Sequence, residues 1–411
     1  MKRAQLESNV LVLVTLALTA FGLVMVYSAT SARAADGNGQ PMYYLTRQAI
    51  FALAGVVALV LAARTPYGFW RRTAPTLLVI SLVLLAGVLV AGSQVNGARR
   101  WIPLGAFSFQ PSELAKVALA AWAAAHLARR RRPTTLGELV RPLGVVAGLA
   151  CVLVLVEPDL GTAIAIALMI GGMLVVAGTP GGLLARCFAI VTALGVLAIW
   201  LEPYRRARLF SFLNPWGDPQ GAGFQVVQAM IGLGSGGIFG VGIGHGVIKN
   251  FDLPEAHTDM IFATIGEELG LVGTAAVIAA YAAFAWAGLR IALACRDPFG
   301  KVLASGLTVL VCAQAAINLA AVLGIAPLTG ITLPFVSYGG SSLIAALAST
   351  GILLNIGSGH GAEGHVALPD RGRGDRRPRR AVDRRRRGAA RARRAGELRR
   401  VAGSARGAAR S

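Results

Sequence analysis

The chain has 411 residues, of which 55% are hydrophobic and only 14% charged, and its formal net charge is +21 at pH 7. The mean hydropathy is +0.62, and so much apolar surface is more than one soluble core can bury, which excludes an ordinary globular domain. The composition therefore predicts an all-α polytopic membrane protein.

Apolar segments recur up to about residue 357, and most have the ~17 to 25 residues that cross a bilayer as a helix. They are too long for the roughly 10-residue alternating strands of a membrane barrel, which favours helices. We predict ten membrane-spanning helices, at residues 9–28, 46–63, 74–92, 112–128, 142–157, 160–177, 182–201, 259–290, 302–324 and 338–357.

Both ends of the chain are predicted to lie in the cytoplasm. Basic residues gather at Met1-Lys2-Arg3 and in the loops after the second, fourth and eighth spans, as expected of cytoplasmic segments, whereas the loop near 178–186 is nearly neutral. Ten spans return the C-terminus to the same side. Ala32-Arg33-Ala34 resembles a signal-peptide cleavage site, but the first apolar run is longer than a typical signal core. We therefore expect an uncleaved signal anchor, with a cleaved signal peptide as the alternative.

A large segment, residues 202–258, separates the seventh and eighth spans and is predicted to be an extracytoplasmic loop. Its stretch from Asn214 to Asn250 is rich in glycine, but it has neither the Walker ending nor the preceding strand of a nucleotide site. A re-entrant segment packed closely on the helices is the better interpretation. Several arginines would face outward against the usual charge bias, and they invite a functional explanation: Arg99, Arg100, Arg205, Arg206 and Arg208.

Polar residues inside or beside apolar spans mark interior sites, because exposure to lipid is costly. Glu113 and Lys116 are three residues apart at the start of the fourth span, so they share a helix face and can pair with each other or with a substrate. Glu157 and Asp159 flank Pro158 in the short link between the fifth and sixth spans. Glu157 is expected to be solvated, whereas Asp159 is equally consistent with a helix N-cap and with a site residue.

The stretch LPEAHTDMIFATIGEELG places acidic residues and a histidine at the eighth apolar run, namely Glu255, His257 and Asp259 before it and Glu267 and Glu268 within it. Without a second His or a Cys pair a zinc site is not expected, but carboxylates and a phosphate-bearing substrate could hold a hard cation. Asp259 is either an N-cap of the eighth span or a functional carboxylate. Glu267 and Glu268 are expected to hydrogen-bond to neighbouring helices.

The segment from Pro327 to Ala346 contains Pro334 and the pair Gly339-Gly340, which would interrupt a helix before the tenth span. Broken helices of this kind commonly line a cavity, and Ser337 supplies a hydroxyl group there. The four cysteines show no motif spacing and are expected to be small apolar core residues.

After residue 357 the chain becomes rich in arginine. Residues 360–411 hold 17 arginines and 5 acidic residues, a net charge of about +12. We predict a membrane domain of residues 1–357 and a disordered cytoplasmic tail of residues 358–411 that can rest on anionic lipid headgroups. Nucleic-acid binding is not expected, because the tail has neither a binding fold nor an aromatic pattern.

Six motifs in order, QPSELAK, PDLGTA, GSGGIFGVGIG, LPEAHTD, IGEELG and LPFVSYGGSS, resemble the SEDS family (shape, elongation, division and sporulation) of cell-wall proteins. The resemblance covers most of residues 10–357. NGARRW, Lys249 and PEAHTD with Ala256 look like the FtsW branch of division and sporulation rather than the RodA branch of elongation. His245-Gly246 replaces a polar pair that is common in the family, and the arginine-rich tail has no counterpart there.

The resemblance implies a ten-helix peptidoglycan glycosyltransferase of the bacterial cytoplasmic membrane that polymerises lipid II on the outer face, at the division septum. It also implies Asp259 as the essential acidic residue and a class B penicillin-binding protein as partner. We predict that Asp259 is the general base of a single displacement, which would invert the anomeric centre. Other divisome proteins and membrane lipids are further expected partners. No organic cofactor is expected, and a divalent cation, Mg²⁺ or Mn²⁺, is an open alternative. The positions assigned to substrate binding are Arg100, Glu113, Lys116, Asp159, Lys249, Glu255, His257 and Ser337.

Three other functions stay open at this point. Intramembrane carboxylates and broken helices fit a lipid II flippase as well as an enzyme. A RodA-type elongation polymerase would share the same motifs. A non-catalytic scaffold of the divisome would need the helix surfaces but not Asp259.

Overall fold

The computed structural model describes residues 2–35, 41–95, 98–105, 107–129, 133–221, 223–247 and 255–359. Helices dominate these residues, which confirms the predicted all-α class, and each predicted span coincides with a helix. These helices are α1 (Lys2–Ala35), α2 (Pro41–Arg64), α3 (Tyr67–Ala91), α4 (Pro111–Arg129), α6 (Val145–Val156), α7 (Leu160–Val176), α8 (Gly181–Leu201), α11 (Ile261–Ala294), α12 (Pro298–Val322) and α13 (Gly340–Ser358).

Eight helical segments in the described part of the chain are long and apolar enough to cross a membrane. One of them is α6 together with the short α5 (Leu136–Leu139) and a π-helical turn (Val140–Gly144) that precede it. The two other predicted spans are α4, with 19 residues, and α7, with 17. Most residues of α4 are buried, so protein rather than lipid surrounds its charged groups.

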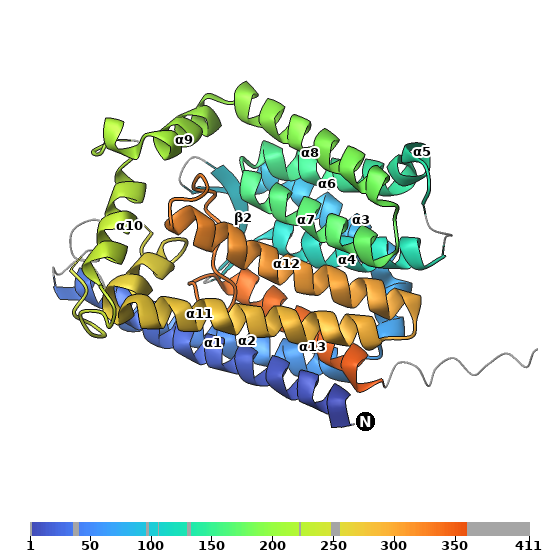
Figure 1. Cartoon of the computed structure of the whole chain (residues 1–411), viewed down its shortest axis with the longest axis horizontal. Coiled ribbons are helices and arrows are strands. Elements are labelled where there is room, and N and C mark those ends of the chain that lie inside the picture. Colours follow the sequence, from blue (N-terminus) through green and yellow to red (C-terminus); the bar gives the residue numbers. More distant parts are fainter. Residues whose placement is uncertain are drawn as a thin grey trace, which may run out of the picture. The chain divides into compact units, whose positions relative to one another are not determined.

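The long helices run alongside one another (Figure 1). α13 packs on α2, α1 on α11, and α12 on both α11 and α7. Glycine allows a close approach of α13 to α2, because a methyl group at Gly351 would overlap the backbone of Leu59. A Cβ at Gly357, near the end of α13, would lie 3.0 Å from the hydroxyl of Ser8 in the first turns of α1. The beginning of the bundle and its end therefore lie together, as an even number of spans requires.

A small antiparallel sheet, which the sequence analysis did not anticipate, connects α3 to α4. It consists of β1 (Ser93–Val95), β2 (Ala98–Leu104) and β3 (Phe107–Phe109), in that order. Trp101 pairs with Ser93, and Ile102 pairs with Phe109. Because β2 contacts α3 and α4, the sheet holds Arg99 and Arg100 at one end of the helices.

The long segment after α8 contains α9 (Pro203–Leu213), a 3₁₀ turn (Pro215–Gly217) and α10 (Phe224–Ser235). α10 packs on α11, in agreement with the predicted close packing of this glycine-rich region. In the turns that follow, Val241 and Gly242 donate backbone hydrogen bonds to the carbonyls of Glu267 and Glu268 at 3.0 Å. This pairing is possible because α11 is interrupted at Gly270, which has a φ of 65° that favours glycine.

The acidic pair in α11 also serves packing. The Ser28 hydroxyl of α1 lies 2.7 Å from both carboxylate oxygens of Glu268. The backbone N–H of Val247 donates to Glu267 Oε1 at 2.6 Å. Both side chains are buried. The expected hydrogen bond to a neighbouring helix is confirmed for Glu268, whereas Glu267 accepts from a turn residue instead.

Candidate active site

Asp259 lies in the turn that leads into α11, yet its carboxylate does not cap that helix. α11 starts at Ile261, and Met260 before it provides no side-chain cap. The Thr258 hydroxyl has a single proton and lies 2.8 Å from Glu255 Oε2 but 3.4 Å from Asp259 Oδ1, so Glu255 receives the better bond. The N-cap interpretation of Asp259 is therefore wrong, and the carboxylate keeps acceptor capacity for a ligand.

The acidity of Asp259 is altered by its surroundings. Burial, and then the neighbouring Glu255 carboxylate, raise the pKa of Asp259 to about 6, while the Arg208 guanidinium opposes the rise. An ordinary aspartate has a pKa of about 3.9. Asp259 is therefore a stronger base than usual and is still mostly ionised at neutral pH, which are the two properties that a general base needs.

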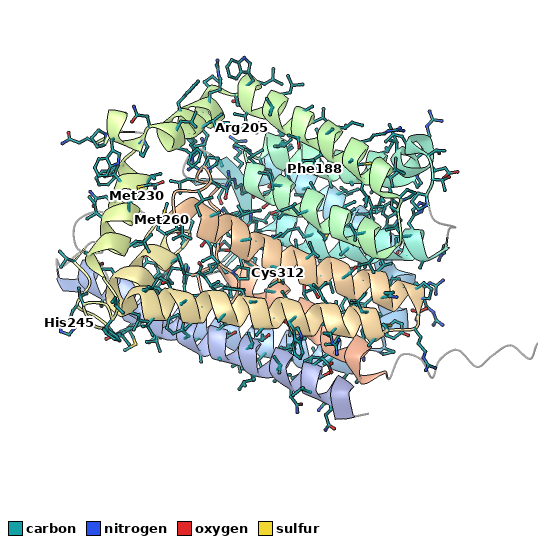
Figure 2. All side chains as sticks on the ribbon, viewed as in Figure 1. Phe188, Arg205, Met230, His245, Met260 and Cys312 are labelled. Atoms are coloured by element: carbon teal, nitrogen blue, oxygen red, sulfur yellow. The ribbon has the colours of Figure 1, made fainter. Side chains whose placement is uncertain are left out.

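Asn318 of α12 fixes the backbone of this turn. Its Nδ2 donates to the carbonyl of Asp259 at 2.7 Å and to that of Ile331 at 2.8 Å. Figure 2 places Met260, the residue after Asp259, at the same end of the helices as Met230 of α10. The sequence analysis missed Asn318, although a polar residue in an apolar span is itself a signal of an interior role.

The turn between α6 and α7 brings two further carboxylates to this end. Asp159 caps α7, because its Oδ1 accepts from the Thr162 N–H at 3.0 Å and its Oδ2 accepts from the Thr162 hydroxyl at 2.8 Å. Glu157 is only 1% exposed, so the expectation that it is solvated is wrong. Neither of its carboxylate oxygens has a hydrogen-bond partner among the described residues. Burial and then the Asp159 charge raise the pKa of Glu157 to about 8, against the opposing effect of Arg100.

Two of the outward arginines bind the backbone around Glu157. Arg100 of β2 donates from Nε to the Glu157 carbonyl at 2.8 Å and from Nη2 to the Pro158 carbonyl. Arg205 of α9, labelled in Figure 2, donates to the Leu155 carbonyl. These carbonyls lie at the C-terminal end of α6, where helices lack internal donors and carry partial negative charge. Arg100 and Arg205 thus have a structural function, which the sequence analysis did not foresee.

Arg208, one turn further along α9, lies near Asp259 instead. Its Nη1 donates to the Leu328 carbonyl at 3.1 Å, and its guanidinium lies over the Tyr204 ring, 4.8 Å from the centroid. A Cβ placed at Gly330 would be 3.9 Å from Asp259 Oδ2 and 4.0 Å from Arg208 Nη1. The carboxylate and the guanidinium are therefore within about 8 Å of each other, and both border the open space beside Gly330.

Glu113 and Lys116 form the predicted ion pair at the start of α4, with 2.8 Å between Lys116 Nζ and Glu113 Oε1. Lys116 is only 1% exposed. Gln314 of α12 and Ser349 of α13 line a small cavity beside the pair. The pair thus faces a small cavity that is also lined by α12 and α13, and each charge stabilises the other in the interior.

His257 and Ser337, two further predicted substrate contacts, stabilise the structure around the turn that holds Asp259. The ring of His257 packs against Tyr44 and Tyr338, at centroid distances of 4.9 and 5.5 Å. Its carbonyl accepts from the Tyr338 N–H at 2.9 Å. The Ser337 hydroxyl accepts from the Leu333 N–H at 2.8 Å, so it holds the interrupted segment before α13 in shape.

A metal held by protein side chains alone is not favoured in the described part of the chain, which contains no group of three or more His, Cys, Asp or Glu suited to binding one. Glu255 is close enough to Asp259 for its negative charge to raise the pKa of the Asp259 carboxyl. Because Mg²⁺ is commonly bound by one or two carboxylates plus substrate phosphates, this donor set fits a cation shared with such a substrate. Lys249, the remaining predicted substrate contact, lies outside the described residues.

Comparison with known proteins gives consistent matches over most of the chain. The sequence model of the family described as "Cell cycle protein", which groups FtsW, RodA and SpoVE, matches residues 8–360. The chain is 43% identical over 353 residues to the probable peptidoglycan glycosyltransferase FtsW of Trichlorobacter lovleyi, covering 85% of this chain and 93% of that protein. It is 40% identical over 353 residues to stage V sporulation protein E of Bacillus subtilis, covering 84% and 95%.

Solved structures share the fold. A chain from the work "Structural coordination of polymerization and crosslinking by a peptidoglycan synthase complex" matches with a TM-score of 0.71 and 31% identity, covering 85% of this chain and 97% of that one. The rod shape determining protein RodA of Thermus thermophilus matches with a TM-score of 0.63 and 30% identity, covering 85% and 96%. From its motifs, its helices and these matches, the chain belongs to the FtsW, RodA and SpoVE family of cell cycle proteins.

Proposed function

We propose that this chain is a peptidoglycan glycosyltransferase that polymerises lipid II on the outer face of the cytoplasmic membrane, with Asp259 as the general base. The 4-hydroxyl of an acceptor GlcNAc attacks the anomeric carbon of a MurNAc that is linked to polyprenyl pyrophosphate. As the new C–O bond forms, the bond to the pyrophosphate oxygen breaks and its electron pair leaves with the polyprenyl pyrophosphate. The hydroxyl proton passes to Asp259, and this single displacement inverts the anomeric centre.

The observation that best supports the proposal is the environment of the Asp259 carboxylate. It lies in a turn held by Asn318, it does not cap α11, and its pKa is raised to about 6. A positioned base of this kind typically contributes roughly 10²- to 10⁴-fold to the rate. The name of the Trichlorobacter lovleyi relative, a probable peptidoglycan glycosyltransferase, supports the reaction class.

The leaving pyrophosphate needs positive charge nearby. Arg100 already donates from Nε and Nη2 to two backbone carbonyls, and Lys116 is paired with Glu113, so part of the donor capacity of each is used within the chain. A divalent cation held near Glu255 would supply further neutralisation of the phosphates. The protein group that fits this task is considered below.

The partner and cellular role also belong to the proposal. The neighbouring structure concerns a complex that couples polymerization and crosslinking, which supports a class B penicillin-binding protein as the crosslinking partner. The FtsW of Trichlorobacter lovleyi and stage V sporulation protein E of Bacillus subtilis are 43% and 40% identical to this chain. The FtsW name and the NGARRW and PEAHTD motifs support a role in division at the septum, with other divisome proteins, over a RodA-type role in elongation.

The test is lipid II polymerisation in detergent by the purified full chain, with its class B penicillin-binding protein and with Mg²⁺ or Mn²⁺. We expect glycan chains from the wild type and none from an equally stable Asp259→Asn variant. A flippase needs sealed vesicles with two sides, so transport in vesicles without polymer in detergent would overturn the proposal. Equal function of both proteins in cell division, without polymer from either, would indicate a scaffold.

A further inference from the structure

We propose that Arg208 binds the pyrophosphate of the departing polyprenyl carrier in the open space beside Gly330. This inference rests on the proposed function and names the protein group that receives the leaving charge. Arg208 is therefore a substrate-binding residue on α9, opposite the carboxylate that activates the acceptor sugar.

Arg208 has the donors that the role requires. Its hydrogen bond within the described residues uses Nη1, which donates to the Leu328 carbonyl and fixes the guanidinium. The Nε and Nη2 protons remain for two oxygens of one anion, and this forked arrangement matches phosphate geometry. The guanidinium also lies over the ring of Tyr204, and this cation–π contact helps to hold it in position.

The distance between Arg208 and Asp259 suits the two sides of a single displacement. In inverting glycosidases, the group that assists the leaving oxygen and the group that activates the acceptor are ~6.5 to 9.5 Å apart. Arg208 Nη1 and Asp259 Oδ2 are at most about 8 Å apart, an upper limit that is compatible with this range. In the proposed arrangement the reacting carbon lies between them, with the acceptor hydroxyl toward Asp259 and the pyrophosphate toward Arg208.

Gly330 keeps this space open. Its φ is +73°, and apart from its chain neighbours no described residue other than Asp259 and Arg208 comes within 4 Å of the place where a Cβ would lie. Any side chain at this position would project between the two charged groups. The glycine thus serves both the backbone conformation and the entry of a ligand.

Arg205, which lies on the same side of α9, helps to position Arg208. Residues Arg205 and Arg208 are three apart, so they lie on one face of the helix. Arg205 attaches that face to the end of α6 through the Leu155 carbonyl, and no residue of α9 is buried. The arginines therefore contribute to holding this helix in place.

The test measures binding of farnesyl pyrophosphate to the purified full chain by isothermal titration, with farnesol as the uncharged comparison. We expect Arg208→Gln to raise the Kd for farnesyl pyrophosphate at least about tenfold, the loss expected for charge-assisted hydrogen bonds, and to leave farnesol unaffected. Arg99→Gln removes an exposed arginine of β2 and is expected to leave both constants unchanged. Wild-type affinity in Arg208→Gln, or equal losses in both arginine variants, would overturn the assignment.

Gly330→Ala gives a second, independent variant. Gly359 ends α13 with a φ of +72° and has no atom near its Cβ position, so Gly359→Ala carries the same backbone strain away from the site. We expect similar losses of melting temperature in both glycine variants, but weaker binding of farnesyl pyrophosphate only in Gly330→Ala. Unchanged binding there would contradict the open-space argument.

The outcomes separate this inference from the proposed function. Asp259→Asn is expected to bind farnesyl pyrophosphate at least as well as the wild type, because it loses a nearby negative charge. If the wild type binds the probe through Arg208 but never polymerises lipid II, the proposed function fails and the subsite stands. If it polymerises lipid II while Arg208→Gln binds as tightly as the wild type, the subsite fails and the function stands.

Discussion

Asp159 and Asp259 occupy equivalent positions in the sequence and different ones in the structure. Each lies just before an apolar helix and has a threonine nearby. Asp159 receives two hydrogen bonds from Thr162 and caps α7. The Thr258 hydroxyl beside Asp259 lies closer to Glu255 than to Asp259, and Asp259 does not cap α11. One carboxylate is satisfied within the chain, and the other has capacity for a ligand.

The same contrast separates the arginines of α9. Arg205 is engaged with backbone carbonyls at the end of α6 and of α8, whereas Arg208 has one such bond and borders open space. A polar group that the chain satisfies contributes to stability, and a polar group that it leaves partly unsatisfied is available for chemistry. The predictions below test this division, beginning with the largest effect.

Asp259→Asn is expected to lower the rate of lipid II polymerisation by roughly 10²- to 10⁴-fold, because the amide cannot accept the proton. Asp159→Asn keeps a good helix cap and should stay within about threefold of the wild-type rate. Polymerisation assays on matched samples of both variants measure this difference. Equal losses of rate in the two variants would contradict the distinction between Asp159 as a helix cap and Asp259 as a general base.

Lys116→Met is expected to destabilise the protein by roughly 3 to 5 kcal/mol, because it leaves the Glu113 carboxylate buried without its partner. Thermal unfolding in detergent measures the effect. Adding Glu113→Leu to this variant should restore most of the lost stability, since no buried charge then remains. A single variant as stable as the wild type would contradict a structural role for this pair.

The rate of polymerisation should rise with pH and level off above about 6, since Asp259 must be ionised to accept a proton and its pKa is raised to about 6. Below that value the rate should fall about tenfold per pH unit. Glu255→Gln removes a negative neighbour, which lowers the pKa of Asp259 and moves the midpoint to lower pH. A midpoint unchanged in this variant, or moved upward, would argue against Glu255 as the cause.

The smallest effect is expected for Asp159→Ala, which removes the α7 cap and should cost about 1 kcal/mol of stability. Asp159→Asn again serves as the control, because it retains an acceptor for the Thr162 N–H. Thermal unfolding of the two variants, side by side, measures the difference. A large loss of activity in Asp159→Ala at unchanged stability would assign Asp159 to the site instead.

The hydrophobic segments predicted the helices well, because an apolar run long enough to cross the bilayer marks where a spanning helix lies in the sequence. The sheet between α3 and α4 was missed since its strands are only 3 to 7 residues long and carry no clear alternation. The burial of Glu157 was missed for a different reason. Burial of a side chain at the end of α6 depends on segments distant in sequence, such as those of Arg100 and Arg205, which only the folded chain brings to the backbone there.

Within the site, local spacing predicted the Glu113–Lys116 pair because both residues lie on one helix turn. Spacing could not distinguish a cap from a functional carboxylate at Asp259, since that depends on whether the carboxylate meets the first backbone N–H groups of α11. Asn318 and Arg208 meet Asp259 from α12 and α9, so their proximity is a property of the packing.

The central claim is that Asp259 acts on the proton of the acceptor rather than on substrate affinity. The most direct measurement is lipid II binding and single-turnover polymerisation on one preparation of Asp259→Asn. The account predicts a Kd for lipid II close to that of the wild type together with the loss of turnover. Turnover that persists, or turnover that falls only in proportion to weakened binding, would contradict it.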